Sequence, residues 1–126
     1  MINLKVLYVE DSLMARKVVG EFLEENVVVL DVANDGEDAL AKFSTGEYDL
    51  IITDLKMPNM DGYTFMKEVR KVNKEIDIIV VSAFKGDKEL SECQEVNIYD
   101  FLEKPLDLNL LDDSLKRVAV KLGRML

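Results

Sequence analysis

The sequence predicts an α/β fold, in which helices cover both faces of a doubly wound, five-stranded parallel sheet. Five short apolar runs without helical spacing alternate with five segments in which apolar residues recur every three or four positions. Right-handed crossovers restrict such a sheet to the doubly wound strand orders, and five strands favour the order 2-1-3-4-5. We therefore expect a three-layer sandwich of five strand–helix units, (βα)5.

The first two units are expected within residues 1–46. Residues 6–9 form an apolar strand, and Ser12 follows it as a helix-capping residue. Residues 27–32 form the second strand, and the turn at residues 34–36 leads into a short helix. The apolar positions with helical spacing are Ala15, Val18, Val19, Phe22 and Leu23 in the first helix, and Ala39, Leu40 and Phe43 in the second.

The third unit ends its strand on a carboxylate. Residues 50–53 are apolar or β-branched, which is typical of a strand buried on both faces, and Asp54 follows directly. Pro58 favours an irregular loop there, and Asp61-Gly62 then opens a helix. The expected inner face of this helix comprises Phe65, Met66, Val69 and Val72.

The sequence indicates the elements of the last two units with unequal clarity. Residues 78–81 are the most β-branched run of the chain and lead to Ser82, whereas the helix expected over residues 87–96 has few apolar residues. We expect that helix to be marginal and mobile. Residues 99–102 form the fifth strand, and Asp107 caps the last helix. The apolar positions are Leu90, Cys93 and Val96 in the weaker helix, and Leu108, Leu111, Leu115, Val118 and Leu122 in the last one.

Composition limits the classes of function that the chain can serve. Its 126 residues fit one domain, and no linker or repeat interrupts the pattern, so we place residues 1–126 in a single domain. A net charge of −9 disfavours direct binding to nucleic acid or anionic lipid. No apolar run is long enough to span a membrane and no signal-peptide pattern opens the chain, so we expect a cytoplasmic protein. The single cysteine, Cys93, cannot form an internal disulfide, and its spacing favours a core position.

Acidic residues follow two strands that the expected order makes neighbours. Glu10 and Asp11 follow the first strand and Asp54 follows the third, so all three should converge at the C-terminal edge of the sheet. Carboxylates at such short distances repel one another, and a divalent cation relieves the repulsion. Mg²⁺ prefers oxygen ligands, and the backbone carbonyl of Lys56 could complete the set that the protein supplies.

The same edge should carry Ser82 after the fourth strand and Lys104 after the fifth. These groups suit phosphoryl transfer: Asp54 would be the nucleophile, Mg²⁺ and Lys104 the countercharges, and Ser82 a hydrogen-bond donor. Each residue alone also has a structural interpretation, because the acids favour a helix N-terminus, Ser82 can cap a helix and Lys104 can form a surface ion pair. Their coincidence at one edge favours a common site.

These residues resemble the motifs of receiver domains of bacterial two-component response regulators, which share the flavodoxin-like strand order of CheY. The likeness spans essentially the whole chain, and no output domain is recognisable. A stand-alone receiver and a receiver cut from a larger regulator or hybrid kinase would look the same. The residues that carry the likeness are Glu10-Asp11, Asp54 with Met57-Pro58 and Gly62 after it, Ser82-Ala83 and Lys104-Pro105.

The resemblance implies a role for each site residue. Asp54 is implied as the phosphoacceptor. It would bind Mg²⁺ directly together with Asp11 and the carbonyl of Lys56, and Glu10 would contribute through water. The family also implies that the Lys104-Pro105 peptide bond is cis, a form essentially confined to bonds before proline.

The resemblance also implies a switch. Ser82 and Lys104 would contact the acyl phosphate, and Ser82 would move toward it and vacate space into which Phe101 rotates. This movement would shift the surface formed by the fourth helix, the fifth strand and the last helix between two states. Phe101 replaces the commoner tyrosine, so a plain core aromatic is an equally good interpretation. The side chains of Lys56 and Phe84 flank the site in the family.

Because the chain has no histidine, the resemblance implies that a sensor histidine kinase or a phosphotransfer protein donates the phosphoryl group. Met14, Ala15 and Val18 are candidates for its docking surface by family likeness, and they could equally be core residues. The chain would assist only its own phosphorylation and dephosphorylation, so we do not expect an enzyme. Its downstream protein partner is left unidentified, and a homodimer that depends on phosphorylation is left open.

A Mg²⁺-dependent phosphohydrolase that forms an aspartyl-phosphate is the leading alternative. Phosphohydrolases of the haloacid dehalogenase type need a second aspartate two residues after the nucleophile, where this chain has Lys56, and a cap that is missing here. A flavin-binding module fits less well, because no Gly/Ser/Thr-rich phosphate loop follows the first strand.

Overall fold

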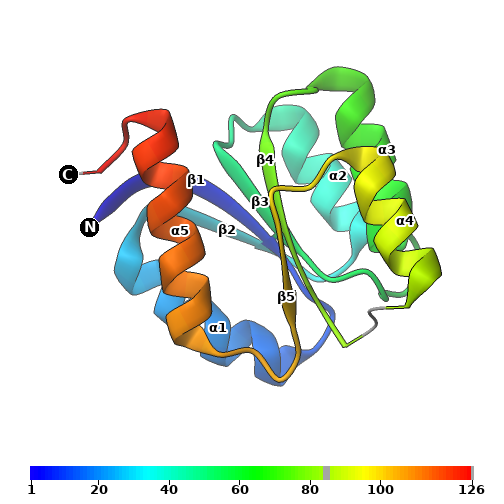
Figure 1. Ribbon diagram of the computed structural model, residues 1–126, viewed down its shortest axis with the longest axis horizontal. Coiled ribbons are helices and arrows are strands. Elements are labelled where there is room, and N and C mark those ends of the chain that lie inside the picture. Colours follow the sequence, from blue (N-terminus) through cyan, green and yellow to red (C-terminus); the bar gives the residue numbers. More distant parts are fainter. Residues whose placement is uncertain (84–85, 126) are drawn as a thin grey trace.

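The computed structural model describes residues 1–83 and 86–125, and within them it confirms the expected doubly wound fold. The strands are β1 (Ile2–Val9), β2 (Val27–Ala33), β3 (Leu50–Thr53), β4 (Asp77–Ser82) and β5 (Asp100–Glu103), and the helices are α1 (Leu13–Asn26), α2 (Gly36–Thr45), α3 (Gly62–Val72), α4 (Asp87–Val96) and α5 (Leu108–Leu122). All strand pairs are parallel, in the order β2-β1-β3-β4-β5. Figure 1 shows α1 and α5 on one face of the sheet and α2, α3 and α4 on the other.

Burial follows from the position of each strand in the sheet. The central strand β3 is buried at all four positions, as expected of a strand covered on both faces. β2 lies at the edge, and Val28 and Val29 in it are exposed. Two hydrophobic clusters result: Tyr8 and Ile52 pack with α1 and α5, whereas Leu7 packs on the opposite face with α2, α3 and α4. In the part of the chain that the structure describes, no helix has the length and apolar character needed to cross a membrane.

Side-chain caps fix where four helices begin. Ser12, Asp35, Asp61 and Asp107 each accept a hydrogen bond from a backbone N–H in the first turn of α1, α2, α3 and α5. A side-chain cap of this kind is worth about 1 kcal/mol relative to alanine. The capping residues predicted for the first and last helices are therefore confirmed.

The structure differs from the sequence prediction mainly at the ends of elements. Val72 and Leu122 were expected on inner faces, but they are the last residues of α3 and α5, and 79 % and 39 % of their surface is exposed. Val18 is exposed too, because α1 turns another side toward the sheet. β1 begins at Ile2, earlier than predicted, where the chain forms an antiparallel bridge with Met125.

The two ends of the described chain lie side by side (Figure 1). The N–H of Asn3 donates to the carbonyl of Arg124 at 3.0 Å, next to the bridge between Ile2 and Met125. Because Ile2 is the first residue of β1, both ends lie at the N-terminal edge of the sheet. The C-terminal edge, where the strand tips meet, lies on the opposite side.

The helix α4 contributes little to the core. Only Cys93 and Val96 are buried among its ten residues. The core position predicted for Cys93 is confirmed, and burial raises the pKa of its thiol to about 11. The mobility of this helix stays a prediction.

Arg70 of α3 ties the end of α4 to its neighbours. Its guanidinium donates at 2.7 to 3.2 Å to four backbone carbonyls, those of Asn73, Ile76, Val96 and Asn97. These carbonyls lie at the end of α4 and in the loop before β4, so one side chain joins three segments of this face.

We predict that Arg70→Met lowers the free energy of unfolding by about 1–3 kcal/mol, because four carbonyls lose a charged donor. The measurement is urea unfolding followed by far-UV circular dichroism. Lys71→Met is the matched control: Lys71 is an exposed neighbour that pairs with Glu68 at 2.8 Å, and its loss should change the free energy by less than about 1 kcal/mol. Equal unfolding midpoints for the two variants would contradict the role given to Arg70.

Candidate functional site

The register of the sheet brings the ends of β1 and β3 together. Val9 lies opposite Thr53 in these paired strands, so the next residue of each strand, Glu10 and Asp54, leaves the sheet beside the other. The N–H of Asp54 donates to the carbonyl of Val9 at 3.2 Å and extends the ladder by one bond. Strand pairing therefore places the site.

Three carboxylates converge at this edge. Glu10, Asp11 and Asp54 each offer an oxygen, and these oxygens lie within 4.8 Å of one another. Glu10 and Asp54 are buried, whereas Asp11 is exposed. Burial raises the pKa of Glu10, because the charged form loses hydration, and hydrogen bonds from Lys104 and the N–H of Ser12 offset only part of this effect.

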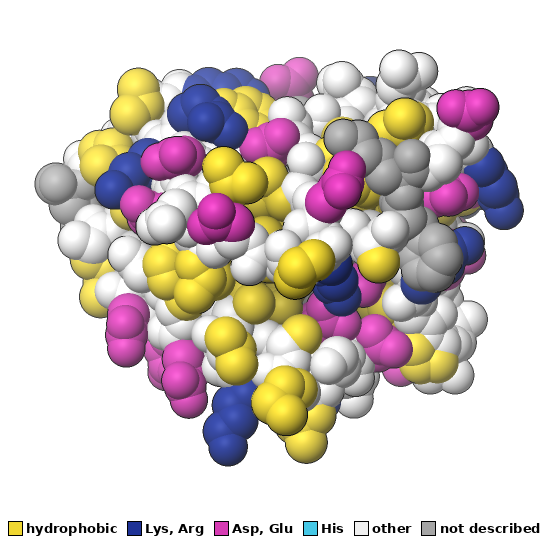
Figure 2. All heavy atoms as spheres, turned by 60° about the horizontal axis from the view of Figure 1, so that its bottom comes forward, with side chains coloured by type: hydrophobic (Ala, Val, Ile, Leu, Met, Phe, Trp, Pro, Cys, Tyr) yellow, Lys and Arg dark blue, Asp and Glu magenta, His cyan; other side chains and the backbone are white. Residues whose placement is uncertain are grey.

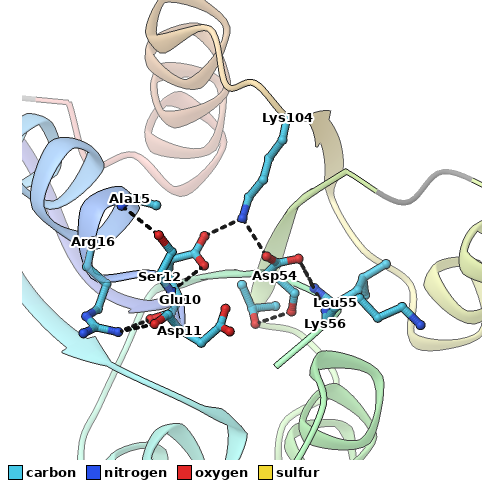
Figure 3. A network of polar contacts seen from close by, with 10 residues as sticks. Glu10, Asp11, Ser12, Ala15, Arg16, Asp54, Leu55, Lys56 and Lys104 are labelled. Atoms are coloured by element: carbon cyan, nitrogen blue, oxygen red, sulfur yellow. Dashed lines mark hydrogen bonds and ion pairs between the residues drawn. The ribbon is translucent and has the colours of Figure 1, made fainter. Parts of the chain in front are cut away.

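Lys104 lies between two of these carboxylates (Figure 3). Its Nζ is 2.7 Å from Glu10 Oε1 and 2.7 Å from Asp54 Oδ2. Its backbone N–H donates to the carbonyl of Ser82 at 3.0 Å, and the Lys104-Pro105 peptide bond is cis, as the resemblance implied. Burial acts to lower the pKa of Lys104, but the hydrogen bonds to the two carboxylates outweigh it and raise the pKa.

The carboxylate of Asp54 is held on both sides. Its Oδ2 accepts from Lys104, and its Oδ1 accepts from the N–H of Leu55 at 2.6 Å and from the N–H of Lys56 at 3.4 Å. The backbone of Lys56 is thereby placed beside the carboxylates. Ser82 is fully buried at the C-terminal end of β4, the strand next to β3.

The expected switch residue Phe101 is half-buried in β5. It packs against the hydrophobic cluster of α3 and α4, and with Leu90, Cys93 and Ile98 it lines a cavity of about 310 Å³. This position fits a core aromatic and leaves the rotation of the ring a prediction. Phe84, the second residue expected to flank the site, lies outside the described residues.

The donor set fits a hard divalent cation. Three carboxylates meet one ammonium group at this point, so negative charge is in excess at their oxygens. Mg²⁺ prefers oxygen ligands and is typically held by one or two carboxylates together with water. The residues whose oxygens lie close enough together to share such an ion are Glu10, Asp11 and Asp54.

Arg16 is a contributor that the sequence did not reveal. Its guanidinium donates to the carbonyl of Glu10 at 2.8 Å and to that of Asp11 at 3.0 Å, and it fixes the backbone of the acidic pair (Figure 3). No sequence signal pointed to it, because the contact depends on how the chain passes from β1 into α1.

A groove of about 380 Å³ opens beside the carboxylates, between α1 and the chain after β5. Met14 and Val18 on its α1 side are 74 % and 53 % exposed and Ala15 is half-buried, so the first two are not core residues. Pro105 and Leu106 also line this groove, a contribution that the sequence analysis missed. Figure 2 shows hydrophobic side chains beside a group of acidic and basic ones on this side of the molecule.

The fold and the pocket define a doubly wound α/β domain with an acidic site at the switch point of its sheet, where the strand order reverses. A family model described as the response regulator receiver domain matches residues 6–116. The chain belongs to this family, and it is a receiver domain of two-component systems.

Three similar proteins illustrate the match. The protein-glutamate methylesterase/protein-glutamine glutaminase of Clostridium acetobutylicum is 36 % identical over an alignment of 126 positions, which covers 94 % of this chain and 36 % of that protein. The chain thus spans little more than a third of this relative. The N-terminal domain of an uncharacterized protein from Wolinella succinogenes has a TM-score of 0.90 at 30 % identity and covers 95 % of this chain and 98 % of its own. A chain in the CheX-CheY-BeF3-Mg²⁺ complex of Borrelia burgdorferi has a TM-score of 0.84 at 29 % identity over 93 % of this chain and 90 % of its own.

We predict that Lys104→Met destabilises the metal-free protein by about 3–5 kcal/mol at about pH 7, because Glu10 and Asp54 lose their shared countercharge. The loss should shrink at about pH 5. The pKa of Glu10 is raised in the folded protein, so folding favours the protonated form of this carboxyl group. That contribution to the free energy of unfolding is present at low pH and is lost as the pH rises through the folded-state pKa of Glu10. At low pH a protonated Glu10 no longer needs the countercharge of Lys104.

The measurement is urea unfolding in the presence of EDTA at the two pH values. Lys116→Met is the control, because the pair of Lys116 with Asp112 is exposed, and it should cost less than about 1 kcal/mol at either pH. A loss that is the same at both pH values would argue against the shared contact.

Proposed function

We propose that the chain takes a phosphoryl group onto Asp54, which serves as the phosphoacceptor of a phosphorelay. One observation carries the proposal: Asp54 is only 7 % exposed, and its carboxylate lies at the switch point, between the ammonium of Lys104 and two further carboxylates. A buried nucleophile beside a fixed cation is typical of sites for covalent group transfer.

The transfer forms a bond between an Asp54 carboxylate oxygen and the phosphorus of the donor, while the bond from phosphorus to the donor nitrogen breaks. Lys104 neutralises charge on the phosphoryl oxygens, since its Nζ already lies beside Asp54. The N–H groups of Leu55 and Lys56 hold the carboxylate in one orientation before the donor arrives.

Asp11, Asp54 and the carbonyl of Lys56 are the residues that would hold Mg²⁺ directly, and Glu10 would act through water. When bound, Mg²⁺ supplies positive charge that reduces the repulsion between the acceptor carboxylate and the phosphoryl group. The excess of carboxylates over ammonium at the site supports this assignment. So does the likeness to a chain of the Borrelia burgdorferi complex, which includes Mg²⁺ and BeF3.

Ser82 and Phe101 would relay phosphorylation to the surface of α4, β5 and α5. An acyl phosphate carries about −1.5 to −2 charges in place of the single charge of the Asp54 carboxylate, and we expect the Ser82 hydroxyl to turn toward it. The cavity of about 310 Å³ beside Phe101 offers room for the ring to repack. Because α4 buries only two of its residues, a change in its packing involves little core surface.

A sensor histidine kinase or a phosphotransfer protein would supply the phosphoryl group, since the chain contains no histidine. The groove lined by Met14, Val18, Pro105 and Leu106 opens beside the site, and its exposed apolar side chains suit a docking helix of the donor. In this proposal residues 1–126 act as one receiver domain that assists only its own phosphorylation and dephosphorylation.

Acetyl phosphate with Mg²⁺ should add one phosphoryl group to the wild-type chain and none to Asp54→Asn, because an amide cannot form the acyl phosphate. Intact-protein mass spectrometry measures the addition. Equal labelling of the two proteins would refute the assignment of Asp54. Steady turnover of p-nitrophenyl phosphate would instead favour the phosphohydrolase alternative.

Mg²⁺ should stabilise the wild-type protein by about 2.7 kcal/mol when its concentration is about a hundred times its dissociation constant, because the ion binds only the folded site. Asp11→Asn should weaken the binding about tenfold, since the site loses one of its few charged ligands. Isothermal titration calorimetry and urea unfolding measure the two effects. Asp107→Asn, which removes the same charge at the cap of α5, should bind Mg²⁺ like wild type; identical affinities for wild type and Asp11→Asn would exclude Asp11 as a ligand.

A further inference from the structure

The loop between β3 and α3, residues 55–61, is fixed to the site at both of its ends. At its beginning, the N–H groups of Leu55 and Lys56 donate to Asp54 Oδ1. At its end, the N–H of Gly62 donates to the carbonyl of Leu55 at 2.9 Å. A Cβ on Gly62 would lie 2.0 Å from the carbonyl oxygen of Asp54, so α3 begins directly against the backbone of the acceptor.

The middle of the loop is held from outside, by the beginning of α2. Asn59 Nδ2 donates to Asp35 Oδ2 at 2.7 Å, and the N–H of Gly36 donates to the carbonyl of Met60 at 3.1 Å. A Cβ on Gly36 would lie 2.2 Å from that carbonyl oxygen, so this approach requires glycine. Asn59 has a φ of 67°, a backbone conformation that asparagine tolerates better than most residues.

One carboxylate joins the loop to the helix. Asp35 Oδ1 accepts from the N–H of Asp38 at 2.8 Å and so caps α2, while Asp35 Oδ2 accepts from Asn59. Hydrogen bonds to an ionised carboxylate are stronger than those between neutral groups. Because Lys56 lies only three residues before Asn59, a contact that fixes Asn59 also restricts the backbone of Lys56.

We propose that the hydrogen bond between Asp35 and Asn59 is a positioning contact for the phosphorylation site. It holds the loop so that the backbone of Lys56 stays beside Asp54 and is ready for Mg²⁺ before the ion arrives. The inference rests on the proposed function, because Asp35 and Asn59 act only through Lys56 and Asp54.

Asn59→Gly tests the contact, because glycine adopts the same backbone conformation but has no amide side chain. The dissociation constant for Mg²⁺, measured by isothermal titration calorimetry, should rise about three- to tenfold, the change expected from the loss of one hydrogen bond. The rate of phosphorylation by acetyl phosphate should fall by a similar factor. In the metal-free protein, amide hydrogen exchange at Leu55 and Lys56, whose N–H groups donate to Asp54, should become faster.

Asn97→Gly is the matched control, since Asn97 also has a positive φ, of 57°, but lies at the end of α4. It should leave Mg²⁺ affinity and the exchange of the loop amides unchanged. The double variant Asp35→Asn with Asn59→Asp exchanges the two partners, keeps the net charge and retains a capping residue, so it should restore Mg²⁺ affinity to within about twofold of wild type.

Two results would overturn the positioning role: Asn59→Gly binds Mg²⁺ and exchanges its loop amides like wild type, or it changes only the urea midpoint, to the same extent as Asn97→Gly. If the wild-type chain itself neither binds Mg²⁺ nor accepts a phosphoryl group, the proposed function fails and this inference fails with it. The wild-type measurement therefore separates the two failures.

Discussion

The pairing of β1 with β3 is the interaction on which the site depends. It sets Val9 opposite Thr53. Because Glu10 and Asp54 are the next residues of these two strands, they lie together at the edge of the sheet. Their mutual repulsion is relieved only in part by Lys104. Because the two strands are central and buried, their packing and hydrogen bonds outweigh the unfavourable charge, and the site keeps carboxylates close that would separate in water.

The hydrophobic pattern was sufficient to predict the layers of the fold, because each strand and helix has to bury one or both of its faces. β3 shows no periodicity, yet its short length and β-branched residues distinguish it from a helix, and all four positions are buried. The pattern failed at Val72 and Leu122, which have the correct spacing but are exposed. Spacing does not show how far the neighbouring elements extend along a helix, and at Val18 in α1 it also indicated the wrong side of the helix.

The same distinction explains what could be foreseen of the site. Glu10, Asp54 and Lys104 follow strands, and parallel strands end at one edge, so their meeting was a consequence of topology. The contacts of Arg16 and the hydrogen bond between Asp35 and Asn59 depend on the path of the backbone through loops. A positive φ at Asn59 leaves no periodic signal, so only the structure reveals that the beginning of α2 contacts the loop beside Asp54.

The bridge between Ile2 and Met125 has a consequence for architecture. It lies at the first residue of β1, and for a strand of 8 residues it is separated from the acidic pocket by roughly 26 Å. A module fused to either terminus would be attached at the rear of the sandwich, remote from the chemistry and clear of the approaching donor. With a linker too short to span that distance, such a module would sense the proposed phosphorylation of Asp54 through the packing of the helices on the flanks of the sandwich, without contact with the carboxylate itself.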